Sequence, residues 1–283
     1  MTAPQQSPGD VEPRVTLVRP TKGAGRMDLR ELWEFRELLY YLVWRSIKVR
    51  YKQTALGASW AILQPLLTML VLSVFLGRLA RVPSSGIPYP LFAYAGLVVW
   101  TFFTSALSQS TQSIVEQQVM ITRVYFPRIL LPLSGVVAAT VDMLLSLPVL
   151  IGLMLFYGFA PSRTAWSIPL FLVLAGAAAL GIGLWLSALN VRYRDVRYAI
   201  PFLIQLWFLS TPVMYPSSLL PGRWRVLYGI NPMAGVVEGF RWGLFGTELH
   251  GGLLLVSIAI ILAALVGGFY YFRRMEANFA DVI

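Results

Sequence analysis

Cysteine is absent from this 283-residue sequence, histidine occurs once, and lysine occurs only three times. Without cysteine there is no disulfide, no thiol nucleophile and no cysteine-ligated metal. The single histidine, His250, has no cluster of carboxylates around it, so we predict no metal site. None of the lysines follows a glycine, so the Gly-Lys-Ser/Thr core of a phosphate-binding P-loop is missing. We therefore expect no catalytic residue and no cofactor in this chain, and any ATP-driven work requires another chain.

Charged residues are also scarce, and long apolar runs take their place. Only 13% of the residues are charged and 57% are hydrophobic, against about 25% charged residues in an average soluble domain. A bilayer core about 30 Å thick is crossed by about 20 apolar residues, and a chain in lipid must be helical to satisfy its backbone amides. We therefore predict an all-α integral membrane protein with six transmembrane helices, at about residues 60–77, 91–108, 129–157, 165–189, 199–215 and 252–272.

The distribution of arginine and lysine predicts which side of the membrane each connection faces. With six spans, 17 of the 23 cations lie on the side of the two termini, and 6 lie on the opposite side. Cytoplasmic segments carry the excess of cations, so both termini are predicted to be cytoplasmic. The stretch VRYRDVRY, residues 191–198, is then a cytoplasmic turn between the fourth and fifth spans. Its three arginines hold the two helix ends on that side.

The chain before the first span has two parts. Residues 1–27 hold four prolines and no apolar core, which predicts a disordered cytoplasmic tail. The transmembrane domain, 28–283, opens with a segment, 28–52, in which Asp28 and Glu31 have the spacing of a capping box. Apolar residues recur there at helical intervals, so we predict an N-terminal amphipathic helix in the inner interface, drawn to anionic headgroups by its basic end. The cations on its polar face are Arg45, Lys48 and Lys52.

Two connections between spans are long enough to have structure of their own. Residues 109–128 are polar with few helix breakers, and they predict a short helix on the cytoplasmic surface. Residues 216–251 are too apolar for a free loop and too interrupted by proline to span. We predict two short re-entrant or interfacial helices there, on the outer side, between the fifth and sixth spans.

Asp142 is the one acidic residue in the middle of a predicted span. A carboxyl group at that depth is costly and marks a functional site by default, such as a proton relay. A relay needs further ionisable groups, and no other lies deep in a span. We therefore favour a structural role, in which Asp142 is hydrogen-bonded to serine or threonine hydroxyls or is protonated.

Aromatic side chains are numerous in the spans and at their ends. Most are expected to anchor the protein in the membrane interface or to pack between helices. Some of them are alternatively candidates to line a path for sugars, whose C–H faces stack on aromatic rings through weak contacts that let a polymer slide. The residues considered are Phe75, Trp100, Phe102, Phe103, Trp185, Trp207, Phe208 and Tyr215.

Five stretches of the sequence carry a resemblance to a known family. They are YKQTALGASWAILQPLLTMLVLSVFLGRLA, PYPLFAYAGLVVWTFF, VYFPRILLPL, GLWLSALNVRYRDVRYAIPFLIQLWFLSTPVMYP and INPMAGVVEGFRWGLFG. In this order they resemble the permease subunits of ABC-2 type polysaccharide and polyol-phosphate exporters, a group that includes the O-antigen permeases. The resemblance covers about residues 30–283.

The resemblance implies a half-transporter. Two copies of this chain would form a homodimer and work with two copies of a separate ABC ATPase, which would bind ATP and Mg²⁺. Segments 28–52 and 109–128 would contact the ATPase, whereas the 191–198 turn would either contact it as well or only set topology. The candidate ATPase-docking residues are Glu116, Gln117, Arg123, Arg194 and Asp195.

The resemblance also implies a route for the cargo. The first and fifth spans of the two copies would line a conduit, and the re-entrant elements would close its outer end. The candidate residues for contact with the glycan are Phe75, Trp100, Trp207 and Tyr215. Basic residues at the inner interface would receive the phosphate of a lipid-linked glycan through charge-assisted hydrogen bonds. The candidates for that site are Arg45, Lys48, Arg50 and Lys52.

The predicted function is ATP-driven export of a lipid-linked polysaccharide across the cytoplasmic (inner) membrane, with O-antigen as the preferred cargo. The predicted partners are the ATPase, the glycan, the membrane and a second copy of the chain, with no nucleic acid. The alternatives are export of capsule, of a teichoic-acid-like polymer, or of a drug or small lipid, because a fold alone does not set the cargo. A membrane-bound glycosyltransferase is disfavoured by the lack of a catalytic acid pair, and an ion-coupled flippase by the single buried charge.

Overall fold

A computed structural model describes residues 29–52, 57, 59–276 and 279 of the chain. Within these residues the regular structure is entirely helical, which confirms the predicted all-α class. The predicted tail at 1–27 and the capping box that begins at Asp28 lie outside the described residues.

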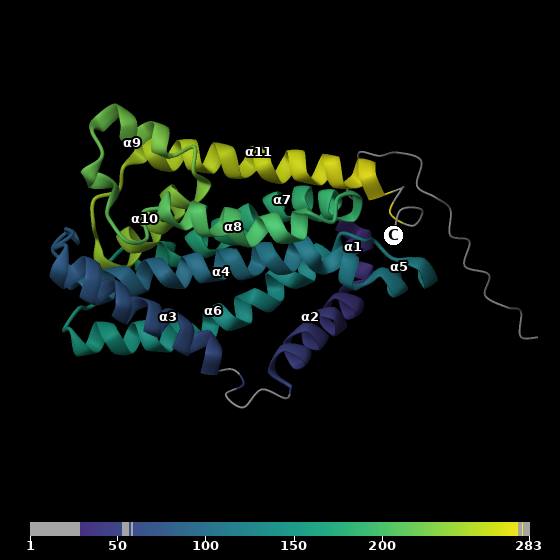
Figure 1. Ribbon diagram of the computed structural model, residues 1–283, viewed down its shortest axis with the longest axis horizontal. Helices are drawn as coiled ribbons and strands as arrows, with labels where there is room; N and C mark the ends of the chain where they lie inside the picture. The colour runs from purple at the N-terminus through teal and green to yellow at the C-terminus, as the bar shows by residue number, and fades with distance from the viewer. Residues whose placement is uncertain (1–28, 53–56, 58, 277–278, 280–283) are drawn as a thin grey trace, which may run out of the picture.

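The long helices are those that the apolar runs predicted (Figure 1). The helices of the first half are α1 (Leu29–Glu34), α2 (Arg36–Tyr51), α3 (Ser59–Leu72), the π-helix η1 (Ser73–Leu79), α4 (Tyr89–Glu116), α5 (Gln118–Arg123) and α6 (Leu130–Phe156). Those of the second half are η2 (Ala165–Ser167), α7 (Ile168–Arg192), α8 (Val196–Leu209), η3 (Ser217–Leu219), α9 (Gly222–Tyr228), α10 (Pro232–Phe245) and α11 (Gly251–Glu276). The described residues thus have two short α-helices, α9 and α10, in the region for which two re-entrant or interfacial helices were predicted.

Helix α4 forms the centre of the bundle, with α6 and α7 packed against it and α11 packed against α7. Its side chains Tyr94 and Phe103 are fully buried. The α7–α11 contact is close because glycines meet there: a β-carbon on Gly268 would lie 2.2 Å from the carbonyl oxygen of Gly181. Small residues that let two backbones approach are the usual basis of helix packing in membranes.

Five helical segments of the described chain are long and apolar enough to cross a bilayer, namely Ser59–Leu79, Tyr89–Glu116, Leu130–Phe156, Ala165–Arg192 and Gly251–Glu276. The predicted fifth span, 199–215, is wrong at its outer end, because α8 stops at Leu209 and has 14 residues. At 1.5 Å per residue such a helix covers about 21 Å, less than the apolar core. Pro212 explains the stop, since proline disfavours helical conformation in the residue before it and lacks an amide donor.

The predicted surface helix over 109–128 is confirmed only in its second part and is wrong in its first part. Helix α4 continues through the polar residues to Glu116, and only α5 is a separate short helix. These polar residues stay in the buried bundle because their hydroxyls bond to carbonyls of their own helix, such as Thr111 to Leu107 at 2.7 Å and Ser113 to Ser110 at 2.7 Å. A hydroxyl satisfied in this way needs no water.

The two described ends of the chain lie at the same end of the bundle. Figure 1 shows α1, α5 and the last turn of α11 together there, with α9 and the start of α11 at the opposite end. This agrees with an even number of crossings. From that end, α2 runs obliquely towards the start of α3, and both α2 and α3 contact α6.

Candidate functional site

A cavity of about 620 Å³ lies between the end of α2, the start of α3 and helices α4, α6 and α8. Its volume falls within the range of about 300–1,000 Å³ that is typical of small-molecule sites. The wall is mixed, with aromatic rings from Tyr51, Trp60 and Phe102. The hydroxyl and amide side chains that complete it are Gln64, Thr101, Thr104, Ser105, Ser108, Gln109 and Ser146. Such a wall presents neutral hydrogen-bonding groups beside ring faces.

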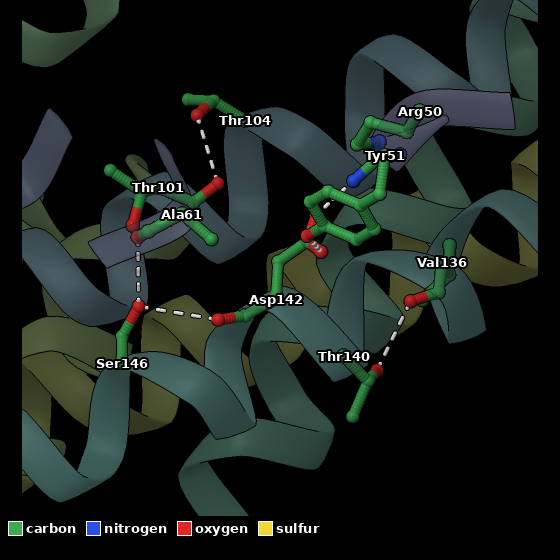
Figure 2. A network of polar contacts seen from close by, with 9 residues as sticks. All are labelled: Arg50, Tyr51, Ala61, Thr101, Thr104, Val136, Thr140, Asp142 and Ser146. Carbon is green, nitrogen blue, oxygen red and sulfur yellow. Dashed lines mark hydrogen bonds and ion pairs between the residues drawn. The ribbon is translucent and has the colours of Figure 1, made fainter. Parts of the chain in front are cut away.

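Asp142 of α6 faces this cavity, and its carboxylate is held by the end of α2 (Figure 2). Arg50 forms an ion pair with Asp142 Oδ2, and the Tyr51 hydroxyl donates a hydrogen bond to Oδ1. The side chains of Arg50 and Asp142 are 31% and 17% exposed, so the pair is only partly shielded from solvent. Two neighbouring donors of one helix therefore fix a carboxylate more than 90 positions later in the chain.

The predicted partners of Asp142 were wrong. Ser146 Oγ lies nearby, but it donates to the backbone carbonyls of Asp142 at 3.2 Å and Ala61 at 3.1 Å, not to the carboxylate. The carboxylate is instead paired with an arginine. In the described part of the chain no second carboxyl group lines the cavity, so a proton relay through Asp142 has no acidic partner there.

Tyr51 is a neutral donor in this network. Burial, together with the hydrogen bond to Asp142, raises the pKa of its phenol to about 12. The hydroxyl therefore keeps its proton at physiological pH. It donates a hydrogen bond to the Asp142 carboxylate and adds no second negative charge beside it.

The four cations proposed for lipid phosphate have two different environments on α2. Arg50 is paired with Asp142, and Arg45 donates to Gln117 Oε1 at 2.7 Å. Lys48 and Lys52 are exposed. A smaller cavity of about 340 Å³ lies between α2, α4 and α6, and Arg45 and Arg50 both line it.

The candidate docking residues are brought together at one end of the bundle. Glu116 and Gln117 lie where α4 meets α5, and Glu116 interacts electrostatically with Arg197 of α8 and with Arg45. The 191–198 turn is therefore close to the α4–α5 corner in space. The residues of this group that are exposed are Glu116, Arg123, Arg194 and Asp195.

The aromatic candidates for the conduit are only partly gathered. The rings of Trp100 and Trp207 lie 6.5 Å apart and those of Phe103 and Trp207 lie 5.1 Å apart, within one cluster. Trp100 is only 5% exposed, so it belongs to the packed core of the single chain. Phe75 lies on η1 and is 60% exposed, whereas the Tyr215 hydroxyl is 2.8 Å from that of Tyr228 in α9.

Arg241 of α10 is a buried structural centre that the sequence pattern did not reveal. Its guanidinium donates to the carbonyl oxygens of Phe92 at 3.2 Å, Pro212 at 2.5 Å and Val213 at 2.6 Å. The side chain is 2% exposed, and a β-carbon on Gly96 would lie 2.4 Å from its Nη2 atom. The sequence signal was an arginine inside an apolar run, but it was counted only as a cation of the outer side.

Asn231 completes the connection between α10 and the end of α8. Its side-chain oxygen accepts from Trp207 Nε1 at 2.9 Å, and its amide donates to the carbonyl oxygen of Ser210 and to Thr211 Oγ1, both at 2.9 Å. Arg241 and Asn231 thus satisfy the carbonyls that become free where α8 stops. Non-helical backbone at this position is tolerated only because protein groups bind it.

No metal site is formed by the part of the chain that the structure describes. It holds no group of three or more histidine, cysteine or acidic side chains with metal-binding geometry. His250 contacts the guanidinium of Arg225, an environment that disfavours a second cation.

Comparisons with known proteins agree with this architecture. Residues 37–245 match the family model described as ABC-2 type transporter. The chain is 30% identical over 261 residues to the O-antigen export system permease protein RfbA of Myxococcus xanthus, which covers 90% of this chain and 98% of that protein. A Klebsiella pneumoniae protein of the same name is 29% identical, covering 87% of this chain and 95% of its own length.

A further relative is the polysialic acid transport protein KpsM of Escherichia coli, 26% identical over 240 residues, covering 82% of this chain and 92% of that protein. The apolar helices and these relatives together indicate a multi-pass protein of the inner membrane. Because the family model covers well over half of the sequence, this chain belongs to the ABC-2 type transporter family of membrane proteins.

Proposed function

We propose that this chain is the permease subunit of an ATP-driven exporter that moves a polysaccharide, most favourably an O-antigen, out across the inner membrane. The observation that carries the proposal is the likeness to O-antigen export permeases over 87–90% of the chain. The family match spans α2 to α10, so it includes the cavity, the Asp142 network and the contacts that Arg241 and Asn231 make after α8.

The chemistry of the cavity supports a sugar cargo. Its amide and hydroxyl groups can exchange hydrogen bonds with sugar hydroxyls, and Trp60 and Phe102 offer ring faces for the C–H side of a pyranose. Neutral, individually weak contacts are needed where a long polymer must move past a site without stopping. A site built for tight binding would instead converge charges on one point.

The energy is proposed to come from two copies of a separate ABC ATPase with bound ATP and Mg²⁺. The α4–α5 corner and the 191–198 turn are the surface for its docking, because they share one end of the bundle and expose Glu116, Arg123, Arg194 and Asp195. ATP binding would move these elements, and α4 would transmit the movement directly into the core of the bundle.

A second copy of the chain is proposed to complete the conduit. Helix α3 and η1 expose apolar side chains along most of their length, and α8 does so along its outer face. In a bilayer such faces suit either lipid or another helix. The candidate residue Phe75 lies on the exposed face of η1, and Trp207 lies on α8, partly buried in its cluster with Trp100 and Phe103. A dimer that joins these elements would bring both rings near the conduit. Exposed apolar residues of α3 and η1 include Leu67, Leu70, Val71, Val74 and Phe75, and those of α8 include Phe202, Leu203, Leu206 and Leu209.

The cargo is proposed to arrive attached to a lipid, with its phosphate bound at the basic end of α2. Arg45, Lys48, Arg50 and Lys52 concentrate positive charge there, and Arg50 lines the cavity. Positive charge on the cytoplasmic side attracts anionic headgroups over roughly a Debye length.

Export of capsular polysaccharide is the second candidate, since the chain also resembles KpsM. The alternatives of a teichoic-acid-like polymer and of a drug or small lipid use the same architecture. A deletion strain distinguishes them. Loss of surface O-antigen, restored by the parental gene only in the presence of an active ATPase, supports the proposal, whereas normal O-antigen with changed drug accumulation contradicts it.

A further inference from the structure

The carboxylate of Asp142 is bound as an oxyanion ligand would be bound. One of its oxygens pairs with the Arg50 guanidinium and the other accepts from the Tyr51 hydroxyl, so each oxygen has its own donor. An arginine and a hydroxyl that converge on two oxygens are also a suitable donor set for a phosphate. The pair of donors is therefore an oxyanion site, and Asp142 is the oxyanion that fills it.

The surroundings fit exchange of this ligand for another. Arg50 is the only cation and Asp142 the only anion among the described residues that line the 620 Å³ cavity. The Gln64 and Gln109 amides line the same space and add neutral donors for further phosphate oxygens. The cavity thus has room beside the ion pair, and its two charges cancel while Asp142 is in place.

We propose that Asp142 is a self-ligand in an oxyanion site formed by Arg50 and Tyr51, and that the phosphate or pyrophosphate group of a lipid carrier displaces it. This inference rests on the proposed function, because it takes the cargo to be lipid-linked. It adds that Asp142 of the protein itself occupies the site until the cargo arrives.

The energetics favour exchange. A partly exposed ion pair contributes little, because its charges are screened by solvent. A phosphate carries more charge than a carboxylate and offers an additional oxygen to nearby donors. Displacement is therefore favourable for a phosphate that is delivered on a lipid chain in the adjoining bilayer.

Displacement has a mechanical consequence. The Arg50–Asp142 pair is a charged contact between α2 and α6, which pack against each other. Once a phosphate occupies Arg50 and Tyr51, Asp142 loses its partner and faces a like charge. Helix α2 then loses its charged contact with α6. Because Arg45 of the same helix donates to Gln117 at the proposed docking surface, the arrival of cargo is linked to that surface.

A purely structural ion pair makes a different prediction. If Asp142 only clamps α2 to α6 and no phosphate binds Arg50, removing either charge damages the same contact, and Arg50→Gln leaves the affinity for a phosphate unchanged. If Asp142 is a competing ligand, removing it and removing Arg50 change phosphate affinity in opposite directions. The sign of the effect therefore decides between the two roles.

The test uses the full chain in nanodiscs of zwitterionic phosphatidylcholine, with farnesyl pyrophosphate and inorganic pyrophosphate as separate probes. Asp142→Asn keeps the shape and removes the charge, and Arg50→Gln removes the cation. Matched controls are Glu37→Gln and Arg36→Gln, an acid and a base that are exposed at the other end of α2. If Asp142→Asn fails to fold, Asp142→Ser repeats the measurement, and a thermal unfolding curve of each variant verifies folding.

If Asp142 fills the site about nine-tenths of the time, its removal tightens farnesyl pyrophosphate binding about tenfold. Arg50→Gln is expected to weaken it by at least about tenfold, and the controls are expected to stay within about twofold. Folded Asp142→Asn that binds no tighter than the parent overturns the proposal. Equal tightening of inorganic pyrophosphate supports the oxyanion site and overturns the lipid source.

The measurement is independent of export. Opposite signs for the two variants, combined with normal surface glycan in a deletion strain, retain the oxyanion site and reject the proposed function. Loss of surface glycan in the deletion strain, combined with equal signs, retains the proposed function and rejects the self-ligand.

Discussion

Arg241 donates a 2.6 Å hydrogen bond to the carbonyl oxygen of Val213, and the same guanidinium donates to the carbonyl of the preceding Pro212. These carbonyls lie just beyond the last turn of α8. A helix that stops inside the apolar part of a membrane protein leaves such groups without partners. The buried Arg241 of α10 therefore compensates for the early end of α8, because it binds the carbonyls that follow this helix.

Replacing Arg241 is expected to destabilise the chain more than replacing any exposed arginine. Arg241→Leu leaves the carbonyls of Pro212 and Val213 buried without their donor, with an expected loss of at least about 3 kcal/mol in the free energy of unfolding. Arg241→Lys keeps a charge but cannot reach all three acceptors. Unfolding in detergent measures the loss, and exposed Arg223 of α9 supplies the control Arg223→Leu. Equal stability of the two variants would contradict this role.

The close contact of α7 and α11 predicts opposite outcomes for two glycines. Gly268→Ala introduces a β-carbon against the Gly181 carbonyl and is expected to cost about 1–3 kcal/mol. Gly152→Ala in α6 meets no atom within 4 Å and is expected to be neutral or to stabilise the helix by up to about 1 kcal/mol. Chemical denaturation of the two purified variants measures the difference, and similar losses in both would show that the contact is looser than described.

Asn231 is expected to shield the segment that follows Leu209, the last residue of α8, from water. Asn231→Ala removes the contacts to Trp207, Ser210 and Thr211, so the segment after α8 should become accessible. Since the chain has no cysteine, a cysteine placed at buried Val213 is a unique label. Faster reaction with a membrane-impermeant maleimide in the Asn231→Ala background is the predicted result. The control is the same cysteine in the parental background, and unchanged labelling would count against shielding by Asn231.

The proposed docking surface predicts a loss of ATPase binding without a loss of insertion. Glu116→Lys is expected to reduce co-purification of the ATPase, because it reverses the charge at the α4–α5 corner. The double change Arg194→Ala with Asp195→Ala is expected to lower transport while membrane insertion stays normal. Glu248→Lys, an exposed acid of the 246–250 connection before α11, is the control. Parental transport by the double variant would leave the 191–198 turn with its topological role alone.

Most of the helical architecture was predictable because its causes are local. A run of about 20 apolar residues must be helical in lipid, and this gave α4, α6, α7 and α11 to within a few residues at most of their ends. The exception was α4, whose last turns contain serine and threonine. Polarity alone suggested that these residues leave the bilayer, whereas their hydroxyls bond to the carbonyls of their own helix.

The polar network was not predictable, because its partners are far apart in the sequence. Asp142 could be recognised as unusual, but Arg50 lies 92 positions earlier and had been assigned to the surface of an interface helix. Arg241 is buried against carbonyls 28 and 29 positions earlier, at a point where the sequence suggested a continuous span. Hydrophobic periodicity carries no information on such pairings, since they depend on how the helices are packed.

ATP-dependent uptake of glycan into inside-out membrane vesicles is the most direct test of the proposed export activity. Vesicles are prepared with this chain, its partner ATPase and a labelled lipid-linked O-antigen. The polysaccharide is predicted to become protected from externally added glycosidase only when ATP is present and both proteins are intact. Protection without ATP, or no protection with both proteins present and an active ATPase, would contradict the proposal that this chain is the permease of a polysaccharide exporter.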